Sequence, residues 1–537
     1  MNVAPPFPRT ERARIVLGWT AAVALGFAVL ARFPGVSEPE ASTFGTADRI
    51  ATFWGTLPAH PVRAAAALDD AFGRVPRPPL ADATLGAVHA VLAPLGEAWS
   101  HRLGTVAWAA LLTALLAALG LNLAGPVGGL LAPALLWVAP RTLQLGITAG
   151  PDVAEAALWL AALAAWRAAL GARSAAARVP SALAVAIAVG AAAASRADGW
   201  VLLPLLGAST LLLALHAQRL ARRVAANVEE TEHGSVPRTR GALLALALTL
   251  VAVPAIGLAT WPWLWRAPLH RLALALHPLA VQSGAAGPVA GLAHALPAAL
   301  LAVLAGGVVH AVARVVRAVR VGDAAAASDD GLLLLLAVAP LALASAGLAG
   351  AGPGIRAAFP ALPVLALLGA RALASAGAAL APDRPARAAA AVAVFALWPA
   401  AHATLHHFPH GAAAWGELAG GAPGAASRGL PRQDGGEAIA SLLPDLSEHA
   451  RPGARIWWGG LAPEAVRAYR HDGRVRPDLL DAAAPEEADV ALVAVDGRSR
   501  AADARAWTAF RTARPAAGAF VDEVPLAWLY ARPGAWR

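Results

Sequence analysis

The sequence contains no cysteine and no lysine, and it has few charged residues of any kind. Without cysteine, the chain has no disulfide bond, no thiolate metal ligand and no cysteine nucleophile. Without lysine, every one of the 43 residues counted as lysine or arginine is an arginine. Charged residues make up 14% of the 537 residues, against about 25% in soluble domains. The chain therefore lacks the polar surface of a water-soluble globular protein.

Apolar residues take the place of the missing charge. They account for 58% of the chain, and the mean hydropathy is +0.57. A helix that spans a membrane needs about 20 mainly apolar residues. The runs 125–140 and 180–194 are the shortest we assign, and losing either one would reverse the side of every later connection. We predict about eleven spans, at residues 15–31, 103–120, 125–140, 153–170, 180–194, 199–215, 241–260, 292–311, 331–349, 360–378 and 387–404.

The distribution of arginine predicts the orientation of these spans. Arg9, Arg12 and Arg14 precede the first run, and no cleavage pattern follows it. This run is therefore expected to be an uncleaved anchor with a cytoplasmic N-terminus. The net charge of +9 and the pI of about 11.2 then belong to inner loops and do not indicate nucleic-acid binding. Alternation of sides places the following arginines on the inner face: Arg167, Arg173, Arg178, Arg219, Arg222, Arg223, Arg238, Arg240, Arg314, Arg317 and Arg320.

Two stretches interrupt or follow the predicted spans. The predicted membrane domain covers residues 1–407 and includes the first stretch, an outer loop at 32–102. That loop is long, and long structured loops are usually functional. After a linker at 408–432, residues 433–537 are expected to form a small α/β domain on the extracytoplasmic side. Its predicted elements are helices at 437–450, 463–469 and 502–511, strands at 454–458 and 488–495, and a strand or hairpin at 520–531. The predicted fold class is thus an all-α polytopic membrane domain followed by a C-terminal α/β domain.

Charged residues at the predicted outer ends of the spans are the candidate functional residues. A charge beside or inside a bilayer costs free energy, which makes it a candidate for function. Taken singly, each of these residues is also explained as a polar group that ends a helix at the interface. The candidates lie far apart in the sequence but on one face: Glu38, Glu40, Arg77, Asp152, Arg196, Asp198 and Arg356.

The order of the motifs around these residues resembles the lipid-phosphosugar-dependent glycosyltransferases of the GT-C fold. Glycosyltransferase family 39, the protein O-mannosyltransferases and the aminoarabinose transferases of lipid A are the most similar groups. Pro39-Glu40 stands where that family has an Asp-Glu pair after its first span. Other similar elements are Arg77-Pro78-Pro79-Leu80, Gly150-Pro151-Asp152-Val153, Arg196-Ala197-Asp198-Gly199, the Trp-Pro segment 259–265, the segment 356–363 and the closing segment 524–530.

The resemblance implies transfer of a sugar from a polyprenyl-phosphate donor to a lipid, glycan or protein acceptor at the extracytoplasmic face of the cell membrane. It implies that Glu40 is the catalytic base and that Asp152 assists it. Arg77, Arg196 and Arg356 would bind the phosphate, since arginine offers paired donors to phosphate oxygens. Glu38 and Asp198 would complete the substrate site. The resemblance does not specify a cofactor, and it is compatible with a divalent metal ion.

Departures from the pattern keep other functions open. Pro39 replaces the first acid of the pair, and Pro76 replaces the acid before the Pro-Pro element, which fits a catalytically inactive homologue. A transporter or flippase is a further alternative, but it would favour internal repeats and charges at the bilayer midplane, and no repeat is evident. The α/β domain would also suit a binding module of a non-catalytic assembly factor.

Aromatic and histidine clusters receive simpler explanations. Trp261, Trp263 and Trp265 are expected to form an interfacial aromatic belt. His402, His406, His407 and His410 offer imidazoles near the end of the last span, but Pro409 interrupts the helical spacing. A polar cap at the interface explains these histidines better than a zinc site does.

Overall fold

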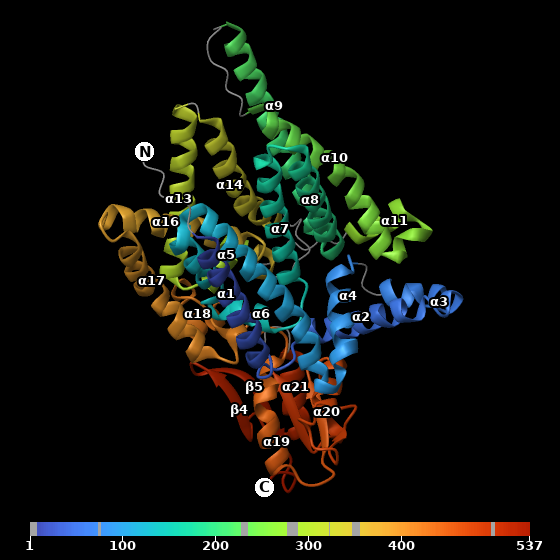
Figure 1. The fold of residues 1–537 in the computed structure, drawn as a ribbon. Helices are drawn as coiled ribbons and strands as arrows, with labels where there is room; N and C mark the ends of the chain where they lie inside the picture. Colours follow the sequence, from blue (N-terminus) through green and yellow to red (C-terminus); the bar gives the residue numbers. More distant parts are fainter. Residues whose placement is uncertain are drawn as a thin grey trace.

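The computed structural model describes residues 8–73, 77–226, 235–276, 288–321, 323–345, 355–495 and 500–537. Long helices make up most of the molecule, and a small sheet with its helices lies at one end of them (Figure 1). The long helices and those of the outer loop are α1 (Arg9–Leu30), α2 (Glu38–Thr56), α3 (Pro61–Phe72), α4 (Leu80–Leu92), α5 (Glu97–Trp137), α6 (Pro140–Ile147), α7 (Asp152–Gly171), α8 (Ala175–Ser195), α9 (Leu202–Ala226), α10 (Ser235–Thr260), α11 (Pro268–Leu276), α12 (Pro288–Ala295), α13 (Ala298–Arg320), α14 (Ala324–Ser345), α15 (Ile355–Ala358), α16 (Ala361–Leu380) and α17 (Pro385–His407).

The protein is an integral membrane protein with an all-α polytopic domain, as predicted. Nine helices in the described ranges are long and apolar enough to cross a membrane. They include α1, α5, α7, α8, α10, α13, α16 and α17, together with the segment Ala197–Leu215. The eleven predicted runs lie mainly on helices: two share α5, one is divided between α12 and α13, and one lies on α14, although its end, 346–349, is outside the described residues.

Helix α5 is a hairpin of two spans. The backbone leaves helical geometry at Ala124 and Gly125, where φ of Gly125 is 63°. The indole Nε1 of Trp137 donates a hydrogen bond to Thr113 Oγ1 over 2.8 Å, whereas a straight helix would separate these residues by about 36 Å. The two arms therefore run back along each other and correspond to the predicted spans 103–120 and 125–140.

Glycines allow the two arms of α5 to approach closely. A Cβ atom on Gly120 would lie 2.3 Å from the carbonyl oxygen of Gly128, and nothing flexible is there to give way. We expect Gly120→Leu to lower stability by about 1–3 kcal/mol through overpacking, measured as thermal unfolding in detergent. Gly18→Leu is the matched control, because no atom lies within 4 Å of that position. Equal unfolding temperatures for the two variants would contradict the hairpin.

The span predicted at 292–311 begins too early. Helix α12 ends at Ala295, and Pro297 precedes a new helix, α13, which extends to Arg320. Proline has no N–H to continue a helix and fits best where a helix begins. The apolar run is therefore divided by the proline, and only its second part belongs to the spanning helix.

The outer loop 32–102 is helical and packs against a later segment. Helices α2, α3 and α4 fill it, and Phe53 and Phe72 pack with Trp261 and Trp263 in one buried cluster. Trp261 and Trp263 are 3% and 7% exposed, whereas Trp265 is 52% exposed. The predicted interfacial belt is therefore wrong for the first two tryptophans, whose rings fill the space between α2, α3 and the 262–266 turn.

The C-terminal part is a small α/β domain, as predicted. Its sheet has the order β2-β1-β3-β5-β4, in which β1 pairs in parallel with β2 and β3, and β5 pairs antiparallel with β3 and β4. Strand β2 has only two residues and was not predicted, because two residues give no alternating pattern. The helices and strands of the C-terminal domain are α19 (Leu443–His449), β1 (Arg455–Gly459), α20 (Pro463–His471), β2 (Leu480–Asp481), β3 (Val490–Ala494), α21 (Arg500–Phe510), β4 (Ala517–Val521) and β5 (Val524–Ala531).

The predicted linker, residues 408–432, packs on the helical domain. Gly411 lies against Pro140, and Gly416 lies against Leu296. The carboxylate of Glu417 accepts a hydrogen bond from the first N–H of α13, that of Ala298. The end of α9 and the start of α10 lie at the opposite end of the helices from the sheet (Figure 1). This arrangement agrees with the predicted separation of arginine-rich connections from the C-terminal domain, while the side of the membrane on which each lies stays a prediction.

Candidate functional site

Glu40 lies in a buried ion pair at the start of α2. Its two carboxylate oxygens accept hydrogen bonds from Arg102 Nε and Nη2, each over 2.7 Å, and the N–H of Ala149 donates to Oε1 over 2.8 Å. Both side chains are 1% exposed or less. The remaining donors of Arg102 bind the carbonyl oxygens of residues 31, 34 and 35 at the end of α1. The pair thus fastens α1, α2 and α5 to the segment before α7.

Asp152, at the start of α7, lies between two arginines. Its Oδ1 accepts from Arg196 Nη1 over 2.5 Å, and its Oδ2 accepts from Arg356 Nη1 over 2.9 Å. Arg196 also holds Asp198 by two bonds of 3.0 and 2.9 Å, and its Nε lies 2.9 Å from Glu155 Oε2. Four of the seven predicted residues therefore meet in one cluster: Asp152, Arg196, Asp198 and Arg356.

Glu40 is close to this cluster. Ala149 binds Glu40 directly and is three residues before Asp152, so that at most about 11 Å separates the Cα atoms of residues 149 and 152. The two acids thus approach the same end of the helices, next to the C-terminal domain. The expectation that they gather at one place agrees with this geometry.

The C-terminal domain contributes an acid to the cluster. Asp434 accepts a hydrogen bond from Arg356 Nη2, and its side chain is 34% exposed. Burial lowers the pKa of Arg356, but Asp434 and Asp152 outweigh it and hold the pKa above its ordinary value. Four carboxylates, those of Asp152, Glu155, Asp198 and Asp434, thus surround two arginines. The surplus of negative charge makes this cluster a poor place for a phosphate group.

Glu38 and Arg77 stand apart from the cluster. The side chain of Glu38 is exposed, and its N–H donates to the carbonyl of Gly435 over 2.8 Å. Arg77 binds Asp82 over 2.8 Å and reaches Thr43 Oγ1 over 3.5 Å, one turn beyond Glu40 on α2. Arg77 therefore belongs to the neighbourhood of Glu40 without touching it.

Arg141 is a half-buried cation that the sequence analysis missed. Its Nε donates to the carbonyl of Ala414 over 2.5 Å, and its guanidinium lies 3.8 Å from the centre of the Trp415 ring. Burial lowers its pKa to about 10, although Asp434 and Glu437 act in the opposite direction. Within the described ranges, its Nη2 has no hydrogen-bond partner. Such an unsatisfied buried donor is costly and calls for an acceptor.

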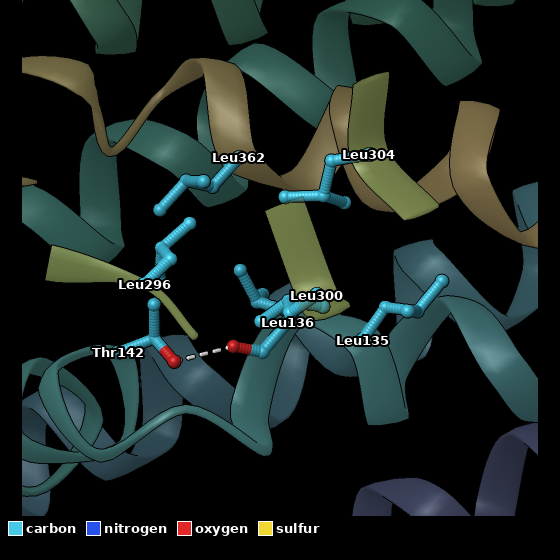
Figure 2. Close-up of a pocket in the computed structure, with 7 residues that line it drawn as sticks. All are labelled: Leu135, Leu136, Thr142, Leu296, Leu300, Leu304 and Leu362. Carbon is cyan, nitrogen blue, oxygen red and sulfur yellow. Dashed lines mark hydrogen bonds between the residues drawn. The ribbon is translucent and has the colours of Figure 1, made fainter. Parts of the chain in front are cut away.

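A narrow apolar pocket begins at the next residue, Thr142 (Figure 2). Thr142 keeps its hydroxyl bonded to the carbonyl of Leu136 over 2.5 Å, so its methyl group is free to face the pocket. The gap between these side chains is too narrow to hold a water molecule, whereas ordinary ligand pockets have roughly 300–1,000 Å³. The lining is otherwise entirely leucine: Leu135, Leu136, Leu296, Leu300, Leu304 and Leu362.

Comparison with solved structures identifies the architecture. The crystal structure of ArnT from Cupriavidus metallidurans bound to undecaprenyl phosphate matches with a TM-score of 0.53 over 97% of this chain and 98% of that one, at 15% identity. The chain has the GT-C fold. The match includes the membrane helices and the C-terminal α/β domain, as the resemblance of the motifs implied.

Two further solved structures match this chain with lower TM-scores. The oligosaccharyltransferase of Archaeoglobus fulgidus, tethered to an acceptor peptide, matches with a TM-score of 0.46 at 12% identity, over 88% of this chain and 64% of that one. Its apo form matches with a TM-score of 0.45 at 14% identity, over 72% and 55%. No protein-family model matches the sequence, and no curated protein matches it.

The buried Glu437 makes the stability of the folded protein depend on pH. Burial raises its pKa to about 8, with Asp434 adding to the effect, whereas an unfolded glutamate titrates near about 4.3. The folded protein therefore binds a proton that the unfolded chain releases, and stability falls as the pH rises from about 4.3 towards 8. We expect Glu437→Gln to flatten this decline and to be more stable than the wild type at pH 9 by more than about 1 kcal/mol. Thermal unfolding in detergent across this pH range tests it, and parallel profiles would contradict it.

Three of the four histidines near the end of α17 contact the C-terminal domain. His406 Nε2 and His407 Nε2 lie 2.6 and 3.2 Å from the carboxylate of Asp522, in the turn between β4 and β5. His410 instead contacts Ser441 over 2.9 Å. The histidines therefore connect two parts of the GT-C fold, which the explanation as an interfacial cap did not foresee.

Proposed function

We propose that this protein is a membrane glycosyltransferase that takes a sugar from a polyprenyl-phosphate donor and transfers it at the extracytoplasmic face. The observation that supports it most is the buried, unpartnered Nη2 of Arg141, the residue that precedes Thr142 of the leucine-lined pocket. A polyprenyl phosphate has this combination of an anionic head and an apolar tail. The fold agrees, because ArnT with the same architecture was solved with undecaprenyl phosphate.

The donor phosphate is proposed to bind at Arg141. Arg77, Arg196 and Arg356 were the sequence-based candidates, but each is paired with at least one carboxylate. Charge-assisted bonds from arginine to phosphate are strong and forked, and Arg141 retains a donor for them. The leucines would have to move apart before the pocket took the first part of the lipid tail, and the rest of the tail would lie in the bilayer. The acids then stay on the acceptor side of the sugar.

The catalytic base is proposed to be one of the acids around Arg356. Glu40 is 1% exposed and both of its oxygens are bonded, so its ion pair would have to open before it accepted a proton. Asp152 is 5% exposed and is held by two arginines. Asp434 is the most accessible of the three, with one oxygen bonded by Arg356. In an inverting displacement, such an acid removes the acceptor proton while the phosphate leaves as an anion.

Sugar transfer in reconstituted membranes tests this function. A panel of labelled polyprenyl-phosphate sugars would be supplied, and transfer of the labelled sugar from each donor to any acceptor would be measured. Asp434→Asn or Asp152→Asn is expected to lower the rate by roughly 100-fold or more, since general base catalysis contributes about 10²–10⁴. Glu40→Gln is the third variant. If all three variants transfer sugar as the wild type does, these acids have no part in the reaction.

An inactive homologue that binds the donor is the second candidate. The saturated pairing of Glu40 and Asp152 with arginines favours it, because each carboxylate would have to leave an arginine before it accepted a proton. Donor binding without transfer by the wild type, for every sugar of the panel, would select this alternative.

A further inference from the structure

Four side chains with metal-ligating atoms converge outside the acid–arginine cluster. Asp48 comes from α2, His89 from α4, and Glu97 and His101 from the first turns of α5. One ligand atom from each lies within 4.8 Å of all the others. His101 Nε2 is 2.9 Å from Asp48 Oδ1, and His89 Nε2 is 3.9 Å from both Asp48 Oδ1 and Glu97 Oε2.

The other nitrogen of each imidazole is already committed. His101 Nδ1 lies 2.8 Å from the carbonyl oxygen of Glu97, which only accepts, so Nδ1 carries the proton. His89 Nδ1 lies 2.6 Å from Ser100 Oγ, whose own proton goes to the carbonyl of Gly96 over 2.5 Å. Nδ1 of His89 is therefore also a donor. A neutral ring in this arrangement presents the lone pair of Nε2 to the carboxylates, and outer partners of this kind orient metal-ligating histidines.

The arrangement brings the Nε2 atoms of two stacked imidazoles together with two carboxylates. The two imidazole rings are stacked, with centroids 3.9 Å apart and planes at 14°. Two positive charges at that distance repel each other strongly, so that at least one ring is neutral. Its Nε2 lone pair then faces carboxylate oxygens, which also carry lone pairs. A cation among the four atoms removes this conflict.

We propose that Asp48, His89, Glu97 and His101 bind one Zn²⁺ ion. Two imidazole nitrogens and two carboxylate oxygens form a tetrahedral donor set that zinc accepts, with bonds of about 2.0–2.2 Å and ligand atoms about 3.3 Å apart. The three measured separations, 2.9, 3.9 and 3.9 Å, lie on either side of that value. The stacked rings open slightly on binding so that both lone pairs meet at the ion.

The ion has a way in and a structural consequence. Asp48 and Glu97 also line a cavity of about 160 Å³ that is bounded by His471 and Arg467 of the C-terminal domain. The site joins α2, α4 and α5. Asp48 lies two turns beyond Glu40 on α2, and His101 precedes Arg102 on α5. The metal therefore holds together the two helices that carry the Glu40–Arg102 pair, and this role does not depend on the proposed sugar transfer.

Metal content of the full-length protein tests the site. Purified protein in detergent is stripped with a chelator, titrated with zinc against a chromophoric chelator, and analysed for bound metal by mass spectrometry. The wild type is expected to bind one zinc ion per chain. His89→Ala and Asp48→Asn are expected to bind it at least roughly 10-fold more weakly, the smallest loss that even outer-shell changes cause. His471→Ala is the matched control, because His471 lines the cavity but is not among the four ligands.

Thermal unfolding provides a second readout. Chelator is expected to lower the unfolding temperature of the wild type and of His471→Ala, and to leave that of His89→Ala unchanged. Absence of bound zinc in the wild type, or equal zinc binding by the wild type and His89→Ala, would overturn the proposal. The four residues would then form a network of histidines and carboxylates only. Neither readout involves sugar transfer, so that failure of this proposal and failure of the proposed function are distinguishable.

Discussion

Arg102→Leu is expected to destabilise the protein by about 3–5 kcal/mol, the cost of leaving one buried charge without its partner. Arg102 is 1% exposed and supplies two of the three hydrogen bonds to the carboxylate of Glu40. Its removal also leaves the carbonyl oxygens of residues 31, 34 and 35 without their donor. Thermal and denaturant unfolding in detergent measure the effect.

The double variant Arg102→Leu with Glu40→Leu provides the internal control. An apolar replacement of both partners is often neutral or stabilising, so the double variant is expected to recover much of the loss. Arg467→Leu is the surface control, because its pair with Glu464 is exposed and exposed pairs contribute only about 0–1 kcal/mol. A single variant no less stable than the double variant would contradict the account of Glu40 as a buried, paired carboxylate.

Arg141→Ala is expected to weaken the binding of undecaprenyl phosphate by about 10- to 150-fold. The figure follows from about 1.5–3 kcal/mol for a hydrogen bond to a charged group. Binding to the purified protein in lipid nanodiscs, titrated with the phospholipid background held constant, measures it. Arg141→Lys keeps the charge but loses the forked donors, and we expect it to fall between the wild type and alanine.

The control for Arg141 is Arg428→Ala, an exposed arginine of the segment 408–432, which Arg141 contacts through Ala414. It is expected to bind the lipid as the wild type does. Equal loss in both variants would mean that general positive charge, rather than Arg141, attracts the lipid. Unchanged affinity in Arg141→Ala would remove the phosphate from that position.

Much of the fold was predictable because membrane helices depend on local hydropathy. Each span needs a run of apolar residues, and a run is visible in the sequence without knowledge of its neighbours. The hairpin of α5 was found in this way, through the break near Gly125. The errors lie where local pattern and packing differ: Pro297 divides one run, and Trp261 and Trp263 pack inward instead of facing the interface.

The candidate site was predictable only in part. Asp152, Arg196, Asp198 and Arg356 stand at the ends of spans, where charge is conspicuous. Glu155 has a usable signal that was overlooked, since it lies three residues after Asp152 and therefore on the same side of α7. Asp434 has no such signal, because its role depends on a contact across 78 residues.

Arg102 and Arg141 were missed for a different reason. Each adjoins an apolar run, where it was counted only as the border of a span. Arg102 is a candidate because it is buried and paired with Glu40, and Arg141 because its buried Nη2 has no partner among the described residues. Neither property can be recognised from the local sequence. The same holds for the proposed zinc site. Glu97 and His101 show helical spacing, but Asp48 and His89 join them only in the folded chain.

Native mass spectrometry of the protein purified in mild detergent tests the central claim most directly. The account predicts that one polyprenyl phosphate, with or without its sugar, remains bound per wild-type chain and is absent from Arg141→Ala. Both proteins could instead carry only bulk phospholipids, even after incubation with excess undecaprenyl phosphate. That result would contradict the proposal that this membrane protein binds a lipid-linked sugar.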